Sequence, residues 1–294
     1  MKVTSFGEVL WDDFPDGKRL GGAPLNLVSR LCSFGADAAI ISRVGDDENG
    51  KEIVRQVAAK QVATDWIQTD SEHATGLVKV SLSASGSASY EIVYPCAWDK
   101  IAVDEAARQR VAESDAFLFG SLATRDAVSY ATLLDLLNHA KFRVFDVNLR
   151  PPFYDFALIE GLMGKADLVK VNDDELYELS AALGSPYHSL EQNIVFLADK
   201  IAGKRFCVTL GEHGAVFYDH GQFCFHGGYR IKVADTVGSG DSFLAAFVYH
   251  YLSGAAPKRV LDFACALGAM VAERHGANPV ILEEQILHFM NPVD

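Results

Sequence analysis

Short runs of apolar and β-branched residues recur along the chain, and most of them are followed by longer segments with helical periodicity. Glycine, acidic residues or asparagine bound most of these runs, as is typical of strand ends. The predicted strands cover residues 3–6, 38–42, 116–119, 143–147, 168–171 and 206–210. Strands that alternate with helices predict an α/β fold, with a mostly parallel sheet and helices on both of its faces.

Two segments break this alternation. Residues 75–94 contain two alternating strands around a turn of small residues, which predicts a hairpin with no helix between its strands. Residues 10–20 predict another extended piece, with a turn at Pro15-Asp16-Gly17. A second small sheet over the main one would explain both segments and could serve as a lid that excludes water. An extension of the main sheet at its edge explains them equally well.

Length and charge narrow the possible functions. A chain of 294 residues with 49% hydrophobic content can bury a large core, as one α/β domain or two smaller ones. The net charge of −13 argues against a nucleic acid or an anionic membrane held through phosphate contacts. No apolar run approaches the roughly 18 residues of a membrane span, so we expect a soluble, cytoplasmic protein. The five cysteines form no C-x-x-C pair, which favours buried free thiols over zinc or disulfides.

The stretch Asp235-Thr236-Val237-Gly238-Ser239-Gly240-Asp241 lies directly before an apolar helical run. Its small residues allow a tight turn, and the helix that follows would present free N–H groups to phosphate oxygens. A carboxylate beside an anion site repels the anion, but Asp241 is well placed if it accepts a proton from an attacking hydroxyl. The alternative is a plain glycine turn in which Asp241 caps the helix.

A second glycine segment, Gly45-Asp46-Asp47-Glu48-Asn49-Gly50-Lys51-Glu52, matches most of the P-loop pattern. Its eighth position is Glu52 rather than a hydroxyl for magnesium, and three acidic residues lie where phosphates would bind. We therefore predict a surface turn that leads into a helix over residues 53–59.

The segment Gly21-Gly22-Ala23-Pro24-Leu25-Asn26 is a candidate binding loop. Its glycines allow close approach of the backbone to a ligand, and Asn26 offers a donor and an acceptor to a hydroxyl-rich molecule. Asp12 lies shortly upstream. A loop followed by a helix start explains the same residues without any ligand.

Three further segments follow predicted strands, where ligands gather in parallel-sheet proteins. Arg150, with Asn148 just before it, suits a sugar oxygen or a transferring phosphoryl group, or else a surface ion pair. Asn172 and Glu175 can hold magnesium through waters, or they can form a capping box. The turn from Thr209 to Gly214 suits a nucleotide lying against backbone, and a plain β-turn explains it equally well.

The order of these motifs resembles that of the ribokinase-like (PfkB-type) family of carbohydrate kinases. That family has G-G-x-x-x-N early, D-x-N-x-R in mid-chain, then N-x-x-E, V-T-x-G-x-x-G and a late D-T-x-G-x-G-D, and all of these occur here in that order. The phrases Gly-Gly-Ala-Pro-Leu-Asn and Phe-Asp-Val-Asn-Leu-Arg-Pro look most like the fructokinase branch. The resemblance implies one ribokinase-like domain over residues 1–294, with a small β-sheet lid formed by about residues 10–20 and 75–97.

The resemblance also implies an activity and its cofactors. The expected reaction transfers the γ-phosphoryl group of ATP, with Mg²⁺, to the primary hydroxyl of a sugar, with fructose giving fructose 6-phosphate. Alternative substrates are 2-keto-3-deoxygluconate, ribose or a nucleoside. A non-catalytic sugar-binding regulator on the same fold is the alternative from another class. A dinucleotide-dependent oxidoreductase ranks lower, because the first strand is not followed by G-x-G-x-x-G.

The family roles transfer to matching positions of this chain. Asp241 would be the base, with the backbone of Gly238, Ser239 and Gly240 as the anion hole. The sugar pocket would be lined by Asp12, Gly21, Gly22 and Asn26, with Arg150 near the transferring group. Magnesium and phosphate would be held by Asn172 and Glu175. ATP would contact Thr209, Gly211, Gly214 and the turn at Gly276-Ala277-Asn278. Asp235 would belong to a monovalent-cation site, which relatives often fill with potassium.

The chain departs from the family pattern at two positions. Ser239 replaces the usual alanine, and Val147 replaces the usual proline. The change to Val147 frees an N–H and would loosen the strand end. Neither change threatens activity. Relatives often form dimers through the small sheet. The apolar alternation over residues 77–82 would permit a homodimer here, or the same residues could pack within one chain.

Overall fold

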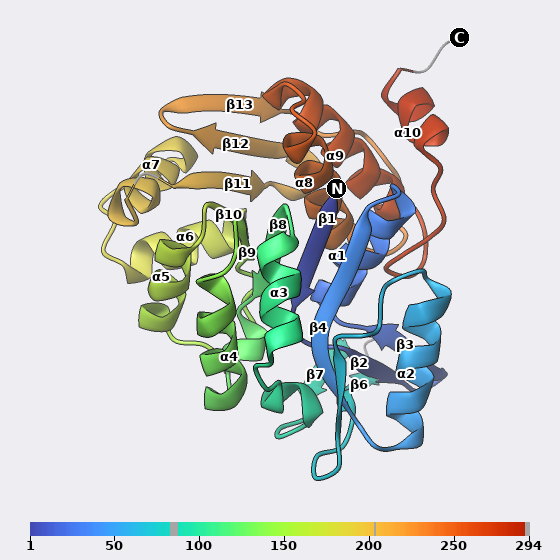
Figure 1. Cartoon of the computed structure of the whole chain (residues 1–294). Coiled ribbons are helices and arrows are strands. Elements are labelled where there is room, and N and C mark those ends of the chain that lie inside the picture. The colour runs from blue at the N-terminus through green and yellow to red at the C-terminus, as the bar shows by residue number, and fades with distance from the viewer. Residues whose placement is uncertain (83–87, 203, 292–294) are drawn as a thin grey trace. The chain divides into compact units, whose positions relative to one another are not determined.

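A computed structural model of the protein describes residues 1–82, 88–202 and 204–291 (Figure 1). The chain divides into an N-terminal unit, Met1–Lys141, and a C-terminal unit, Phe142–Asp294. Whether these act as one domain with an inserted lid stays a prediction, and each unit is described by itself.

The N-terminal unit contains a parallel sheet with the strand order β8-β1-β4-β5. Its strands are β1 (Lys2–Phe6), β4 (Asp37–Gly45), β5 (Ile67–Asp70) and β8 (Ala116–Gly120). Consecutive residues of β1 and β8 are buried, so both faces of the sheet are covered. The helices of this unit are α1 (Ala23–Ser33), α2 (Glu48–Ala59), α3 (Glu105–Glu113) and α4 (Ala127–Leu137), with short 3₁₀ turns η1 (Ala97–Lys100) and η2 (Leu122–Thr124).

A separate four-stranded sheet with the order β3-β2-β6-β7 lies in the same unit. Its strands are β2 (Leu10–Phe14), β3 (Gly17–Gly21), β6 (Gly76–Leu82) and β7 (Ala88–Ile92), paired antiparallel except for the parallel pair β2–β6. The second small sheet is thus confirmed, and the two segments do not extend the main sheet. The turn expected between β6 and β7 lies outside the described residues.

The apolar alternation of β6 is satisfied within the chain. Val78 and Val80 are buried with Leu10, and Phe14 and Ile92 pack against them. On the strands β6 and β7, Lys79 and Glu91 form an exposed ion pair. The alternation therefore needs no second copy of the chain to explain it, and the homodimer stays a prediction.

The C-terminal unit contains a sheet with the order β13-β12-β11-β10-β9. The strands β9 (Arg143–Asp146), β10 (Leu168–Asn172) and β11 (Arg205–Thr209) are parallel, and β12 (Ala215–Asp219) and β13 (Gln222–His226) continue antiparallel. Its helices are α5 (Phe156–Lys165), α6 (Asp173–Ala182), α7 (Leu190–Lys200), α8 (Ser239–Leu252), α9 (Pro257–Ala272) and α10 (Glu283–Met290), with a 3₁₀ turn η3 (Gly211–His213). In Figure 1, α8 and α9 lie side by side, and α9 packs on β12 and β13.

All the strands predicted from the apolar runs are present, with small shifts at their ends. The expectation for Val147 was wrong in one respect. Its N–H is not free, because it donates to Lys170 O at 3.0 Å and continues the pairing of β9 with β10. A proline could not make this bond, so valine tightens this strand end rather than loosening it.

The helix predicted at residues 53–59 begins earlier, at Glu48. Asp47 is its N-cap and accepts a hydrogen bond from Gly50 N at 2.8 Å. The same carboxylate accepts from Thr75 N at 2.9 Å and Thr75 Oγ1 at 2.7 Å. The Asp47 carboxylate therefore ties the turn after Gly45 to Thr75, just before β6. Its oxygens already accept protein donors, which agrees with the prediction that this segment is not a P-loop.

Two cysteines differ from the expectation of buried thiols. All five are free, and Cys96, Cys207 and Cys265 are buried, but Cys32 and Cys224 are partly exposed. Among the residues that the structure describes, no helix is both long and apolar enough to cross a membrane.

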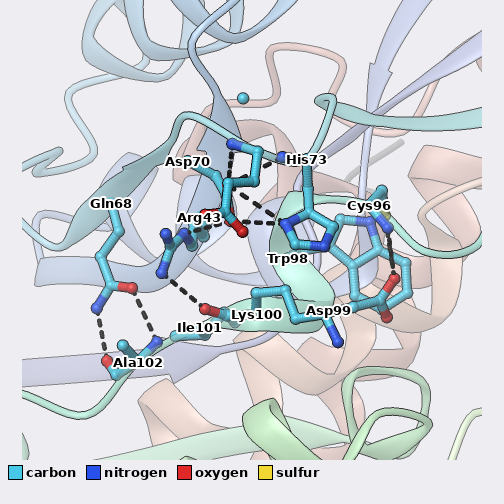
Figure 2. A network of polar contacts seen from close by, with 12 residues as sticks. Arg43, Gln68, Asp70, His73, Cys96, Trp98, Asp99, Lys100, Ile101 and Ala102 are labelled. Carbon is cyan, nitrogen blue, oxygen red and sulfur yellow. Dashed lines mark hydrogen bonds and ion pairs between the residues drawn. The ribbon is translucent and has the colours of Figure 1, made fainter.

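A polar network joins β4, β5 and η1 in the N-terminal unit (Figure 2). Arg43 Nε lies 2.8 Å from Asp70 Oδ2, and Arg43 Nη1 donates to Lys100 O at 2.9 Å. Asp70 Oδ1 also accepts from the backbone N–H of His73 at 2.9 Å. These bonds fix the chain between β5 and β6, so the small sheet is attached to its unit by oriented polar contacts.

Next to this network lies a fully buried ion pair. Arg125 Nε and Nη2 donate to the two carboxylate oxygens of Asp99 at 2.7 and 2.8 Å, and the side chains are 2% and 0% exposed. The guanidinium carbon also lies 3.9 Å from the centre of the Trp98 ring. Removal of either partner lowers the stability of the protein, because the remaining charge is then buried without a counter-charge.

Replacing Arg125 by methionine should lower the free energy of unfolding by about 3–5 kcal/mol, since Asp99 is left buried without its cation. Urea unfolding of the purified variant measures this change. The control is Lys79→Met, which breaks the exposed Lys79–Glu91 pair and should leave stability almost unchanged. Equal small effects of both variants would contradict the importance of the buried pair.

Candidate active site

The predicted sugar-binding residues lie in the N-terminal unit, on the β2–β3 hairpin and the start of α1. Asp12 is on β2, and Gly21 ends β3. A Cβ atom on Gly21 would lie 2.3 Å from Asp12 Oδ2, so the missing side chain is what lets the carboxylate sit against the backbone. The structure therefore brings Asp12 and the glycine pair together.

The helix start that was the alternative interpretation is also present. Gly22 is the N-cap of α1 with φ 115°, and a Cβ atom there would lie 2.4 Å from Glu8 O. Asn26 is buried within the first turns of α1, and its N–H donates to Gly22 O at 2.9 Å. A helix start and a ligand site are compatible here, because capping needs only the backbone of Gly22.

In the C-terminal unit, the stretch 235–241 forms a loop that runs into α8. Asp235 accepts from Val237 N and Gly276 N, each at 3.0 Å, through its two carboxylate oxygens. Helix α8 begins at Ser239, and Gly238 is its N-cap in the left-handed conformation with φ 75°. The interpretation of Asp241 as the helix cap is therefore wrong, because Asp241 lies inside the first turn.

Close packing holds the loop in place. A Cβ atom on Gly238 would lie 2.4 Å from Ala277 O, so the loop contacts the turn that contains Asn278. Ser239 Oγ donates to Gly268 O at 2.9 Å, which shows that the loop forms with serine in place of alanine. The first N–H groups of a helix have no intrahelical acceptor, so the start of α8 is suited to bind an anion.

Asn172 and Glu175 form the capping box that was one of the two interpretations. Asn172 is the N-cap of α6; Glu175 N donates to Asn172 Oδ1 at 2.8 Å, and Asn172 N donates to Glu175 Oε2 at 2.9 Å. Glu175 Oε1 accepts a further bond from Leu149 N at 2.8 Å. Burial raises the pKa of Glu175, although the nearby Lys170 ammonium acts to lower it. The carboxylate thus joins the end of β9 to the start of α6.

Two residues of this region had no role assigned from the sequence, Asp146 of the D-x-N-x-R motif and Lys170. Lys170 Nζ lies 3.0 Å from Asp146 Oδ1, and the side chains are 8% and 9% exposed. Burial acts to lower the pKa of Lys170, but the carboxylates of Asp146, Glu175 and Asp241 raise it, so the side chain stays charged. The signal available in the sequence was a charged residue inside an apolar strand, in Phe145-Asp146-Val147 and Val169-Lys170-Val171.

The nucleotide residues predicted after β11 adopt a tight turn. Thr209 ends the strand in register with Asn172 of β10, so the two motifs lie side by side. Gly211 and Gly214 both have positive φ, and a Cβ atom on Gly214 would lie 2.0 Å from His226 O. The segment after Thr209 is thus a 3₁₀ turn that follows the strand beside Asn172, and its contact with a nucleotide stays a prediction.

Arg150 is exposed in the loop after β9. Its Nη1 donates to Leu149 O at 2.9 Å, and no ion pair joins it to the part of the chain that the structure describes. Among the described residues, the surface ion pair considered for Arg150 is therefore not observed, and its contact with a ligand stays a prediction.

The model of the pfkB family of carbohydrate kinases matches residues 7–284 of this chain. Among curated proteins, the chain is 29% identical over 308 residues to fructokinase-2 of Solanum habrochaites, with 95% of this chain and 92% of that protein covered. It is 25% identical over 275 residues to 2-dehydro-3-deoxygluconokinase of Thermoproteus tenax, with 90% and 82% covered.

The fold is similar to that of solved sugar kinases. The crystal structure of a fructokinase from Vibrio cholerae O395, bound to fructose, ADP and a calcium ion, superposes with a TM-score of 0.84. The identity is 22%, and 99% of each chain is covered. At this identity the similarity shows the ribokinase-like α/β fold, with a mostly parallel sheet and a separate small sheet.

Replacing Gly238 by alanine should destabilise the protein by about 1–3 kcal/mol from backbone strain alone, and its Cβ would also collide with Ala277 O. Gly240→Ala is the matched control, because its Cβ would lie at 3.5 Å from Lys170 Nζ, an ordinary contact. Urea unfolding of both variants measures the difference. A Gly238→Ala variant as stable as Gly240→Ala would contradict the loop geometry.

Proposed function

The chain belongs to the pfkB family of carbohydrate kinases, and on this premise we propose that it transfers the γ-phosphoryl group of ATP to the primary hydroxyl of fructose. The match to a fructokinase over nearly the whole chain supports this substrate. The similarity to a 2-dehydro-3-deoxygluconokinase makes that keto acid the second candidate.

The observation that carries the proposal is the place of Asp241 in the first turn of α8. The helix start offers N–H groups to the charge that develops on the transferred phosphoryl group, and Asp241 is the carboxylate within that turn. A carboxylate beside the attacking hydroxyl accepts its proton, while positioning and charge stabilisation supply the rest of the rate. Gly238, Ser239 and Gly240 form the anion hole in this scheme.

We assign the sugar and nucleotide roles from the family motifs at matching positions. Asp12 and Asn26 offer acceptors and a donor to sugar hydroxyls, with the backbone of Gly21 and Gly22 beside them. Arg150 presents its guanidinium to the transferring group. The residues proposed to contact ATP are Asn172, Thr209, Gly211, Gly214 and Asn278.

The residues also fit a hydrated magnesium ion. Glu175 already accepts backbone hydrogen bonds on both oxygens, so it suits an ion held through water. The described residues contain no group of three or more His, Cys, Asp or Glu side chains that could ligate a metal directly. Mg²⁺ commonly keeps several waters and binds through one or two carboxylates and the substrate phosphates, whose charge it neutralises. Asp235, tied to Val237 and Gly276, is the proposed carboxylate of a potassium site.

The proposed substrate is tested by measuring ADP formation with ATP, Mg²⁺ and a panel of fructose, 2-keto-3-deoxygluconate, ribose and nucleosides. We expect the highest kcat/KM with fructose. Preference for the keto acid would select the second candidate instead. A protein that binds a sugar but consumes no ATP with any of them would be a regulator, and the kinase proposal would fail.

Asp241→Asn should lower kcat by roughly 10²–10⁴-fold, the usual contribution of a general base, because the amide cannot accept the proton. Its urea unfolding should stay close to that of the wild type. The control is Asp174→Asn, the same change at an exposed position in the first turn of α6, which should keep wild-type turnover. Near-normal turnover of Asp241→Asn would rule out the proposed base.

A further inference from the structure

Lys170 is an unusual residue for its position. It lies in β10 among Leu168, Val169 and Val171, all of which are fully buried, and the residue itself is 6% exposed. Lysine is almost never buried to this extent unless it is paired, because its ammonium loses its hydration. An apolar residue at this position would be buried at a lower cost in free energy. The charge of Lys170 therefore has a specific partner or function.

The partners of the ammonium come from separate elements of the C-terminal unit. Asp146 at the end of β9 forms the direct ion pair at 3.0 Å. The charges of Glu175 and Asp241 also act to raise the pKa of this ammonium. One buried cation thus faces carboxylates from a strand end, from the start of α6 and from the start of α8.

The ammonium also lies close to Gly240 of the proposed anion loop. The position that a Cβ atom would take on Gly240 is 3.5 Å from Lys170 Nζ, so the ammonium faces the side of Gly240 that carries no side chain. Gly240 precedes Asp241 in the first turn of α8. The backbone of Lys170 is fixed as well, because its carbonyl oxygen accepts from Val147 N at 3.0 Å. The ion pair with Asp146 and the fixed backbone therefore hold the ammonium close to Gly240.

We propose that Lys170 is a positioning residue for phosphoryl transfer: its buried ammonium supports the Gly240 end of the anion loop and balances the carboxylates of Asp146, Glu175 and Asp241. This inference rests on the proposed kinase function. Without the cation, the three carboxylates that act on it would repel each other and the phosphates of ATP. A displacement of the loop by about 1 Å is enough to slow a positioned reaction roughly 10²-fold.

The test is a double-mutant cycle with Lys170→Met and Asp146→Asn, which removes first the cation and then its partner. Methionine has nearly the length of lysine without its charge. We expect Lys170→Met to be destabilised and to lose roughly 10²-fold in kcat, with a smaller change in the KM of the sugar. Adding Asp146→Asn restores the charge balance, so the double variant should unfold at a higher urea concentration than Lys170→Met alone.

Two outcomes would overturn the proposal. One is a Lys170→Met variant with kcat within twofold of the wild type. The other is a Lys170→Met variant in which only the dissociation constant of ATP rises, together with a double variant that recovers no stability. That combination would identify Lys170 as a direct phosphate ligand. If Lys170→Met does not fold, the double variant tests the proposal instead. A folded double variant supports the charge balance. An unfolded double variant, when Asp146→Asn alone folds, refutes it.

A matched control and a separate readout keep the two proposals apart. Lys200→Met removes a partly exposed lysine of α7, paired with Glu160 at 3.6 Å, and should change neither stability nor kcat. The urea unfolding cycle does not depend on turnover. If the wild-type protein has no kinase activity, the proposed function is wrong. The urea unfolding of the variants still tests the charge balance in that case.

Discussion

The buried ion pair between Lys170 and Asp146 is the constraint on which the candidate site of the C-terminal unit depends. It places one cation between the neighbouring parallel strands β9 and β10, close to the ends where the chain turns toward the loop of Arg150 and toward α6. A buried charge must be balanced, so the carboxylates around it can gather only because the cation is there. Their gathering in turn places Asp241 and Glu175 in one region.

The acidic residues of this protein combine local structure with chemistry. Glu175 closes a capping box and also bonds the backbone after β9. Asp235 joins the loop before α8 to the turn after α9. Asp47 caps α2 and holds Thr75 at the base of the small sheet. A carboxylate already fixed by backbone donors is rigid, which suits it to hold a hydrated ion or to shape a loop without further loss of side-chain freedom.

Sequence reasoning reached the strands, the small sheet and the motif segments because each depends on a local period or on a local turn. It failed where two segments distant in the chain interact. The N–H of Val147 was expected to be free, and its acceptor lies on the next strand. Helix α2 starts earlier than its apolar period indicated, because Asp47 caps it. Lys170 escaped notice because a charge in an apolar strand has meaning only once its partners are placed.

The sequence by itself determined the alternation of strands and helices, the motif order that identifies the family, and Asp241 as the candidate base. These follow from apolar periodicity and from residues whose chemistry is local. Only the tertiary structure decided that Asp241 lies inside the first turn of α8 and that Lys170 pairs with Asp146 close to Gly240. The physical reason is that the charge balance of a buried group depends on all the elements packed around it, and a one-dimensional pattern does not contain that information.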